Sequence, residues 1–303
     1  MAYTLLQQTI YAWFHQIPKE EAAIFALVVF FLIGVANLVI TCRTKAWFML
    51  TVAFTAALEV AGYAFRITML HKPAYGPFVA MQALLIIPPI FLALVDYSAV
   101  GKLMRLAGGG GRLNPAWVAR FFFASDILCL AIQGAGAGLS SSMNGGDQNS
   151  AKALLIVGLI LQLFFFTCFT GITIYINLNK KYGLRGIKQC QPIFICLYVT
   201  IALMYIRSIF RLIEFADGWY GPIASNEVYF YVLDFLMIFL CSVVFTVLHF
   251  GVHLKKAELA LVAVLPVTAP HMQGTETTSM PPKVAGKPSD ASADVVQIQA
   301  LAA

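Results

Sequence analysis

The sequence predicts an all-α integral membrane protein: a seven-transmembrane-helix bundle with its N-terminus outside and its C-terminus in the cytosol. The first observation is the composition: 60% of the 303 residues are hydrophobic and only 11% are charged. A soluble domain has about 25% charged residues. The second observation is the pattern of apolar residues. Their runs are continuous and do not alternate with polar residues, as the strands of a membrane barrel do. Each run also provides the roughly 20 residues that a helix needs to cross a bilayer.

Seven apolar runs follow one another along the chain. The first comes after Lys19, Glu20 and Glu21 without a small-residue cleavage site, so we expect it to stay as a membrane helix. Pro88 and Pro89 lie inside the third, where proline removes backbone donors and bends a helix, as a hinge or as a static kink. The predicted spans are residues 22–42, 46–68, 77–100, 117–139, 153–178, 191–213 and 228–250, within a membrane domain of residues 1–254.

The distribution of basic residues predicts the orientation. Lysine and arginine concentrate in or beside the first, third and fifth links and after the seventh span, at Arg43, Lys45, Lys102, Arg105, Arg112, Arg120, Lys180, Lys181, Arg185, Lys188, Lys255 and Lys256. Positive loops stay in the cytosol. The basic residues are not gathered into one patch with aromatic residues, so we expect no nucleic-acid partner. Residues 255–303, whose later part is rich in Pro, Ser and Thr, are predicted to be a cytosolic, mostly disordered tail.

Charged residues interrupt four of the apolar runs. Each costs about 2.5–3.5 kcal/mol at the centre of a bilayer, so they should face one another or a wet cavity. Several are three, four or seven positions apart, which places them on a common helix face. We therefore predict one polar chamber lined by helices two to seven, with ion pairs that only stabilise the bundle as the alternative. Its candidate residues are Glu59, Tyr63, Arg66, Gln82, Asp126, Gln133, Gln162, Arg207, Arg211, Glu214, Glu227 and Asp234.

Two finer expectations follow from these residues. Glu59 or Asp234 should pair with an arginine of the second or sixth span. Asp126 has no basic residue later in its own span, so it is the first candidate for contact with a substrate or a proton.

The same residues lie in strings that resemble a known family. The most specific string is Arg207-Ser-Ile-Phe-Arg211-Leu-Ile-Glu214-Phe, and others occupy residues 59–66, 82–97, 126–138, 158–162 and 227–234. Together they resemble the fungal RTA-like lipid-translocating exporters over about residues 22–254. One departure is His249-Phe250-Gly251, where the family tends to have His-Pro-Gly.

The resemblance implies a transporter and not an enzyme, one that moves sphingoid long-chain bases or related lipophilic compounds and contributes to resistance to toxic amphiphiles. Its partners would be membrane lipids or amphiphilic small molecules, in the plasma membrane or, alternatively, an internal membrane. Acids such as Glu59, Asp126 and Asp234 could hold an ammonium head group, while the arginines pair with a phosphate or keep the acids ionised. The sequence has no phosphate loop, so we expect no direct use of ATP.

Two other classes stay open. A seven-helix receptor or a lipid or stress sensor would share this layout, although the Asp-Arg-Tyr string of common receptors is absent. A membrane-embedded lipid-modifying enzyme could use Glu59 or Asp126 for acid–base chemistry. His249 and His253 are four apart but have no third histidine nearby, so we expect no metal site and no cofactor.

Overall fold

The computed structural model describes residues 10, 11, 14, 18–107, 114–140, 148–179, 182, 184, 190–217 and 226–264. These residues form helices and no strand. Seven helical segments within them are long and apolar enough to cross a membrane, which confirms the predicted fold class. They run Glu20–Thr44, Trp47–His71, Gly76–Leu106, Pro115–Leu139, Asn149–Leu178, Gln191–Asp217 and Glu227–Leu259.

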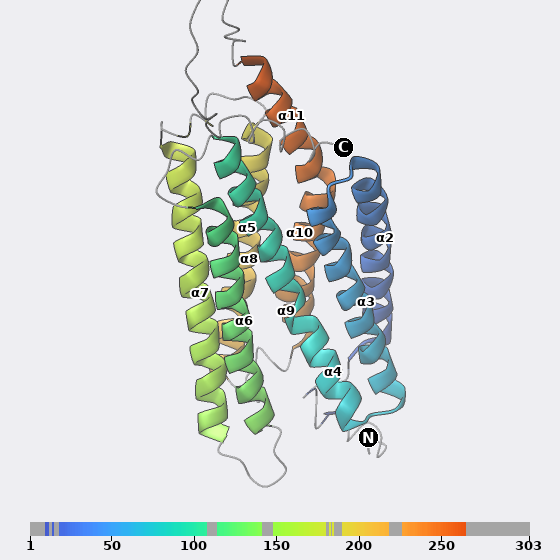
Figure 1. Cartoon of the computed structure of the whole chain (residues 1–303). Coiled ribbons are helices and arrows are strands. Elements are labelled where there is room, and N and C mark those ends of the chain that lie inside the picture. Colours follow the sequence, from blue (N-terminus) through green and yellow to red (C-terminus); the bar gives the residue numbers. More distant parts are fainter. Residues whose placement is uncertain are drawn as a thin grey trace, which may run out of the picture. The chain divides into compact units, whose positions relative to one another are not determined.

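Helices that follow one another along the chain mostly pack side by side (Figure 1). The first two spans are α2 (Glu20–Thr44) and, after the short η1 (Trp47–Met49), α3 (Leu50–His71). The fourth to sixth spans are α6 (Pro115–Ser140), α7 (Gln148–Leu178) and α8 (Gln191–Asp217). Two glycines allow α6 and α7 to approach closely. A Cβ at Gly136 would lie 2.9 Å from the Ala151 carbonyl oxygen, and one at Gly158 would lie 2.6 Å from Gln133 Cγ. Small residues serve this purpose in membrane bundles.

The third span is interrupted at the two prolines. It consists of α4 (Tyr75–Ile86) and α5 (Pro88–Leu106), with the break at Ile87. Proline has no backbone N–H, so Pro89 cannot donate to the carbonyl four residues before it, which belongs to Leu85. The predicted bend therefore falls at Ile87, whose backbone stays helical (φ −69°, ψ −40°), so the interruption lies in the hydrogen bonds and not in the helical path.

The seventh span is interrupted twice. After α9 (Glu227–Phe230) it contains a π-helical turn, η4 (Tyr231–Phe235), followed by α10 (Leu236–Val247) and α11 (Phe250–Val264). The second break falls at Leu248 and His249. It comes just before Phe250, which stands where the family tends to have a proline. Gly251 packs tightly there, since a Cβ on it would lie 2.2 Å from the Ala46 side chain, and His249 Nε2 lies 3.3 Å from the Thr41 hydroxyl. The helix thus breaks without a proline.

The boundary of the membrane domain at residue 254 stays a prediction. The last described helix, α11, runs across it to Val264. Its residues, Leu, Ala, Lys, Glu and Val, are mostly good helix formers, so a helix can continue past the hydrocarbon. The rest of the predicted tail lies outside the described residues.

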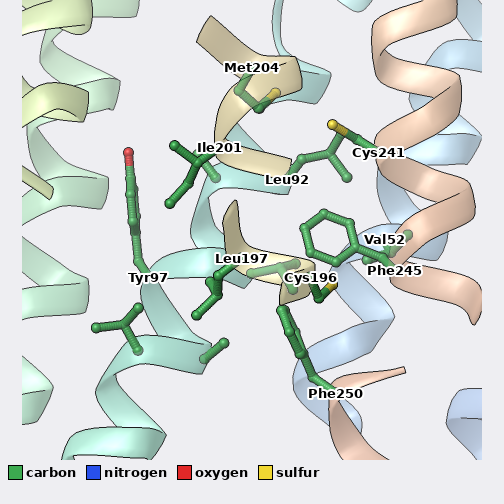
Figure 2. Packing of buried hydrophobic residues seen from close by; sticks show 14 of the residues in the cluster. Val52, Leu92, Tyr97, Cys196, Leu197, Ile201, Met204, Cys241, Phe245 and Phe250 are labelled. Atoms are coloured by element: carbon green, nitrogen blue, oxygen red, sulfur yellow. The ribbon is translucent and has the colours of Figure 1, made fainter. Parts of the chain in front are cut away.

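The core lies between α5, α8 and α10. Figure 2 shows Leu92 of α5, Ile201 and Met204 of α8 and Cys241 of α10, which belong to one cluster of buried apolar side chains. Large apolar side chains on the outside, such as Phe25 and Leu32 of α2, are more than half exposed. In a bilayer such residues meet lipid, so this surface agrees with a spanning bundle.

Candidate functional site

The centre of the site is Asp234, whose carboxylate lies between two arginines of α8. Arg211 donates to both carboxylate oxygens, from Nε to Oδ1 at 3.0 Å and from Nη2 to Oδ2 at 2.5 Å. Arg207 Nε lies 2.8 Å from Oδ1, although its N–H is not directed at that oxygen. All three side chains are buried. The predicted pairing of Asp234 with an arginine of the sixth span is confirmed.

Glu214 completes the α8 side of this cluster. It accepts a hydrogen bond from Arg211 Nη1 at 3.0 Å. The positions 207, 211 and 214 are four and three apart, so one helix face carries all three residues. A bidentate pair is among the strongest contacts that an arginine makes with a carboxylate. Arg211 makes this pair with Asp234 and a further hydrogen bond with Glu214.

The position of Asp234 depends on the π turn. Asp234 is inside η4, Tyr231–Phe235. A π turn holds one extra residue, so it rotates the residues before it relative to the helix after it. Glu227, seven positions before Asp234, begins α9, where the Asn226 side chain caps the backbone N–H of Val228. Such turns are often found at functional sites.

Glu227 joins α9 to α3 through Arg66. Arg66 Nη2 donates to Glu227 Oε1 at 3.0 Å, and the Glu227 carboxylate also accepts from the backbone N–H of Lys19. The Arg66 guanidinium lies 4.8 Å from the centre of the Phe230 ring, a cation–π contact. Arg66 therefore has a different acid from the one that the α8 arginines share.

Arg207 also contacts the break in the third span. Its Nη2 donates to the Leu85 carbonyl oxygen at 3.4 Å. This is the carbonyl that Pro89 leaves without its usual partner. A charged side chain of α8 therefore supplies the hydrogen bond that the broken backbone lacks.

Glu59 is the acid of this region without a matched cation. It lies on α3, is 1% exposed, and its Oε1 has no hydrogen-bond partner. The charged groups that act on it are Asp234, Arg207 and Arg211, and Tyr63 follows one turn later on the same helix, also buried. The whole group, called the arginine cluster below, contains three arginines and four acids: Arg66, Arg207, Arg211, Glu59, Glu214, Glu227 and Asp234. One acid is thus in excess if all four are ionised.

A second polar group lies on α5 and its neighbours. Tyr97 donates to Asp126 Oδ2 of α6 at 2.7 Å, so Asp126 has a partner that its own span did not reveal. Next to Tyr97, Asp96 accepts from the Thr200 hydroxyl of α8 at 3.0 Å. Asp96 is fully buried and was not among the predicted residues. It carries the same signal as the others, an acid within an apolar run.

A third group is the pair Gln133 and Gln162, in which Gln133 Nε2 donates to Gln162 Oε1 at 3.0 Å between α6 and α7. Gln82 is half-buried on α4 and, among the described residues, joins none of the three groups through a hydrogen bond.

These contacts divide the predicted chamber into separate groups. On α8, Thr200 and Arg207 are seven residues apart, about 10 Å along the axis. The apolar Ile201 and Met204 of α8 lie between these two positions along the helix (Figure 2). The polar side chains therefore lie in separate groups, of which the arginine cluster is the largest.

Seven spanning helices around a buried ionic cluster define a polytopic membrane protein. The chain belongs to the RTA1-like family, since the model of the RTA1 like protein family matches residues 52–257, more than half of it. It is 27% identical over 219 residues to Protein RTM1 of Saccharomyces cerevisiae, covering 69% of each chain. No solved structure matches it.

Two further relatives carry functional names. The lipid-translocating exporter-like protein RTA1 of Leptosphaeria maculans is 27% identical over 266 residues, which cover 78% of this chain and 50% of the relative. The sphingoid long-chain base transporter RSB1 of Saccharomyces cerevisiae is 25% identical over 306 residues, covering 86% of this chain and 80% of the relative.

Proposed function

We propose that this protein is a transporter, not an enzyme, and that it moves amphiphilic lipids of the sphingoid-base class across the membrane. Membership of the RTA1-like family supports a multi-pass membrane protein of this kind, and the names of its relatives support lipid translocation. The basic residues at the ends of α2 and α5 support an outside N-terminus and a cytosolic C-terminus.

The observation that carries the proposal is the unpaired oxygen of Glu59. A sphingoid base has an ammonium head and an apolar tail. A buried carboxylate without a hydrogen bond is costly on its own and can accept one from an ammonium group. The excess acid of the arginine cluster thus supplies a counter-charge for a cationic head group.

The arginines have a different part in this mechanism. Arg207 and Arg211 hold Asp234 in a fixed place, which leaves Glu59 as the acid free to exchange partners. The tail of the lipid would stay among the apolar side chains that the bundle presents to the bilayer. A charged head group that leaves water needs an opposite charge within the membrane, because an unpaired charge there is costly.

The interruptions in the third and seventh spans supply places where the helices can change shape. Two of these interruptions lie beside the arginine cluster. Arg207 contacts Leu85 at the proline interruption of the third span, and Asp234 lies inside the π turn of the seventh. Broken helices near the centre of a membrane are typical of transporters.

A transport assay tests the proposal. The chain is expressed in yeast that lacks its own relatives, and movement of a labelled sphingoid base is compared with an empty vector and with an N-acylated analogue that has no ammonium group. We expect faster movement of the base alone. Movement no faster than with the empty vector would contradict a transport function for this class of lipid.

A further inference from the structure

A pocket outside the arginine cluster lies between the end of α5 and the start of α6. Its volume is about 310 Å³, and three cationic side chains line it: Lys102, Arg105 and Arg120. Leu94 and Phe123 form apolar parts of the same wall. Gly101 lets the two helices meet, since a Cβ there would lie 3.1 Å from the Pro115 carbonyl oxygen.

No acid among the described residues pairs with the three cations of this pocket. No acid lines the pocket in the described part of the chain. Across the described residues, the ion pairs involve other side chains. Lys102 Nζ lies 3.3 Å from the centre of the Phe48 ring, a contact that orients the ammonium group but leaves its charge uncompensated.

The N-terminus of α6 adds to this positive field. Its first residues, Pro115 and Ala116, line the pocket, and the N-terminal end of a helix carries a partial positive charge. The Asn114 side chain caps the backbone N–H of Ala116 at 3.1 Å. Mutual repulsion among three uncompensated cations is unfavourable, so the pocket is suited to an anion.

Exposed tryptophans locate the pocket at the membrane–water interface. Trp117, in the first turn of α6, is 67% exposed, and Trp47, next to Phe48, is 66% exposed. Tryptophans concentrate at the level of the lipid head groups. The pocket thus presents cations at head-group level and apolar side chains beside them.

We propose that this pocket binds the phosphate head group of an anionic membrane phospholipid, with one acyl chain along Leu94 and Phe123. Basic pockets between transmembrane helices recognise such lipids. The pocket is separate from the arginine cluster, so this inference does not depend on the proposed transport activity.

The test uses the full chain, purified in a neutral detergent, with bound lipid counted by native mass spectrometry. The probes are phosphatidic acid and phosphatidylcholine, with inorganic phosphate and ATP as soluble competitors. We expect preference for phosphatidic acid. The pocket variant Arg105→Gln/Arg120→Gln should bind it about thirtyfold more weakly, from about 1 kcal/mol for each charge. The matched control Arg43→Gln/Lys256→Gln removes two exposed charges elsewhere and should bind as the parent does.

A second variant, Ala119→Trp, fills the pocket and keeps every charge; it should also lose binding. Equal binding of the two lipids by the parent would overturn the proposal, as would equal losses in the pocket and control variants. Displacement of phosphatidic acid by inorganic phosphate or ATP at low concentration would also overturn it, because the pocket would then be a site for soluble anions.

Discussion

Arg207 of α8 donates a hydrogen bond to the backbone carbonyl of Leu85, 3.4 Å away, at the point where Pro89 interrupts the third span. The same side chain lies 2.8 Å from Asp234 in the π turn of the seventh span. One guanidinium therefore contacts two irregular segments of the bundle, the proline interruption of the third span and the π turn of the seventh. A change in either segment alters the contacts of the arginine, which links the backbone breaks to the ionic cluster.

Restoring the missing backbone donor tests this link. Pro89→Ala supplies an N–H for the Leu85 carbonyl, so the helix regains that hydrogen bond and Arg207 loses its role there. We expect an unchanged or higher melting temperature and severalfold slower transport. Pro192→Ala, in the first turn of α8, is the control, because proline there displaces no helical hydrogen bond. Slower transport in both variants, or in neither, would contradict the link.

Removing the shared acid should damage folding. Asp234→Asn leaves Arg207 and Arg211 buried with only Glu214 as an anion in direct contact. Breaking a buried pair costs about 3–5 kcal/mol, a large part of a typical stability of about 5–15 kcal/mol. The folded fraction after detergent extraction, measured by size-exclusion chromatography, should fall sharply for this variant and not for Glu21→Gln, whose side chain is exposed. Equal folded fractions would place Asp234 in contact with water.

The pair Tyr97 and Asp126 distinguishes a structural from a functional acid. Tyr97→Phe leaves one Asp126 oxygen without its donor, and an unsatisfied buried group costs about 1–3 kcal/mol. If the pair is structural, Tyr97→Phe and Asp126→Asn should be coupled in thermal stability by about 0.5–3 kcal/mol, with transport unchanged. Asp126→Asn that folds normally but no longer transports would instead support the substrate or proton contact predicted from the sequence.

Orientation can be tested with a membrane-impermeant maleimide. All six cysteines are free thiols in the described residues, so a cysteine-free background is prepared first. Glu21 is exposed in the first turn of α2 and Lys256 is exposed on α11, and these two parts of the chain lie at opposite ends of the bundle (Figure 1). In intact cells we expect label on Glu21→Cys alone, and on Lys256→Cys only after permeabilisation. The reverse pattern would invert the proposed topology.

The fold was largely predictable from the sequence, because a membrane helix must satisfy its own backbone and so needs a long apolar run. Pro88 and Pro89 also predicted the break in the third span. The π turn at Tyr231–Phe235 was not predictable. It contains no proline or glycine, so no residue within it signals an irregular helix.

The site was predictable in composition but not in pairing. The spacing of Arg207, Arg211 and Glu214 predicted a common face, and the structure joins them to Asp234. Partners such as Glu227 for Arg66, 161 positions apart, depend on how the spans pack, which no local pattern encodes. For the same reason, the sequence of the fourth span does not reveal the partner of Asp126, which is Tyr97 of α5.

The most direct test of the proposed transport mechanism is the rate at which a labelled sphingoid base crosses the membrane of liposomes that contain the purified protein with Glu59→Gln. This change keeps the size of the side chain and removes its charge. Losing a charged hydrogen bond of about 1.5–3 kcal/mol should slow movement about ten- to hundredfold, while Glu21→Gln stays at the parent rate and both variants remain folded. A folded Glu59→Gln protein that moves the base as fast as the parent would contradict the role of the buried acid.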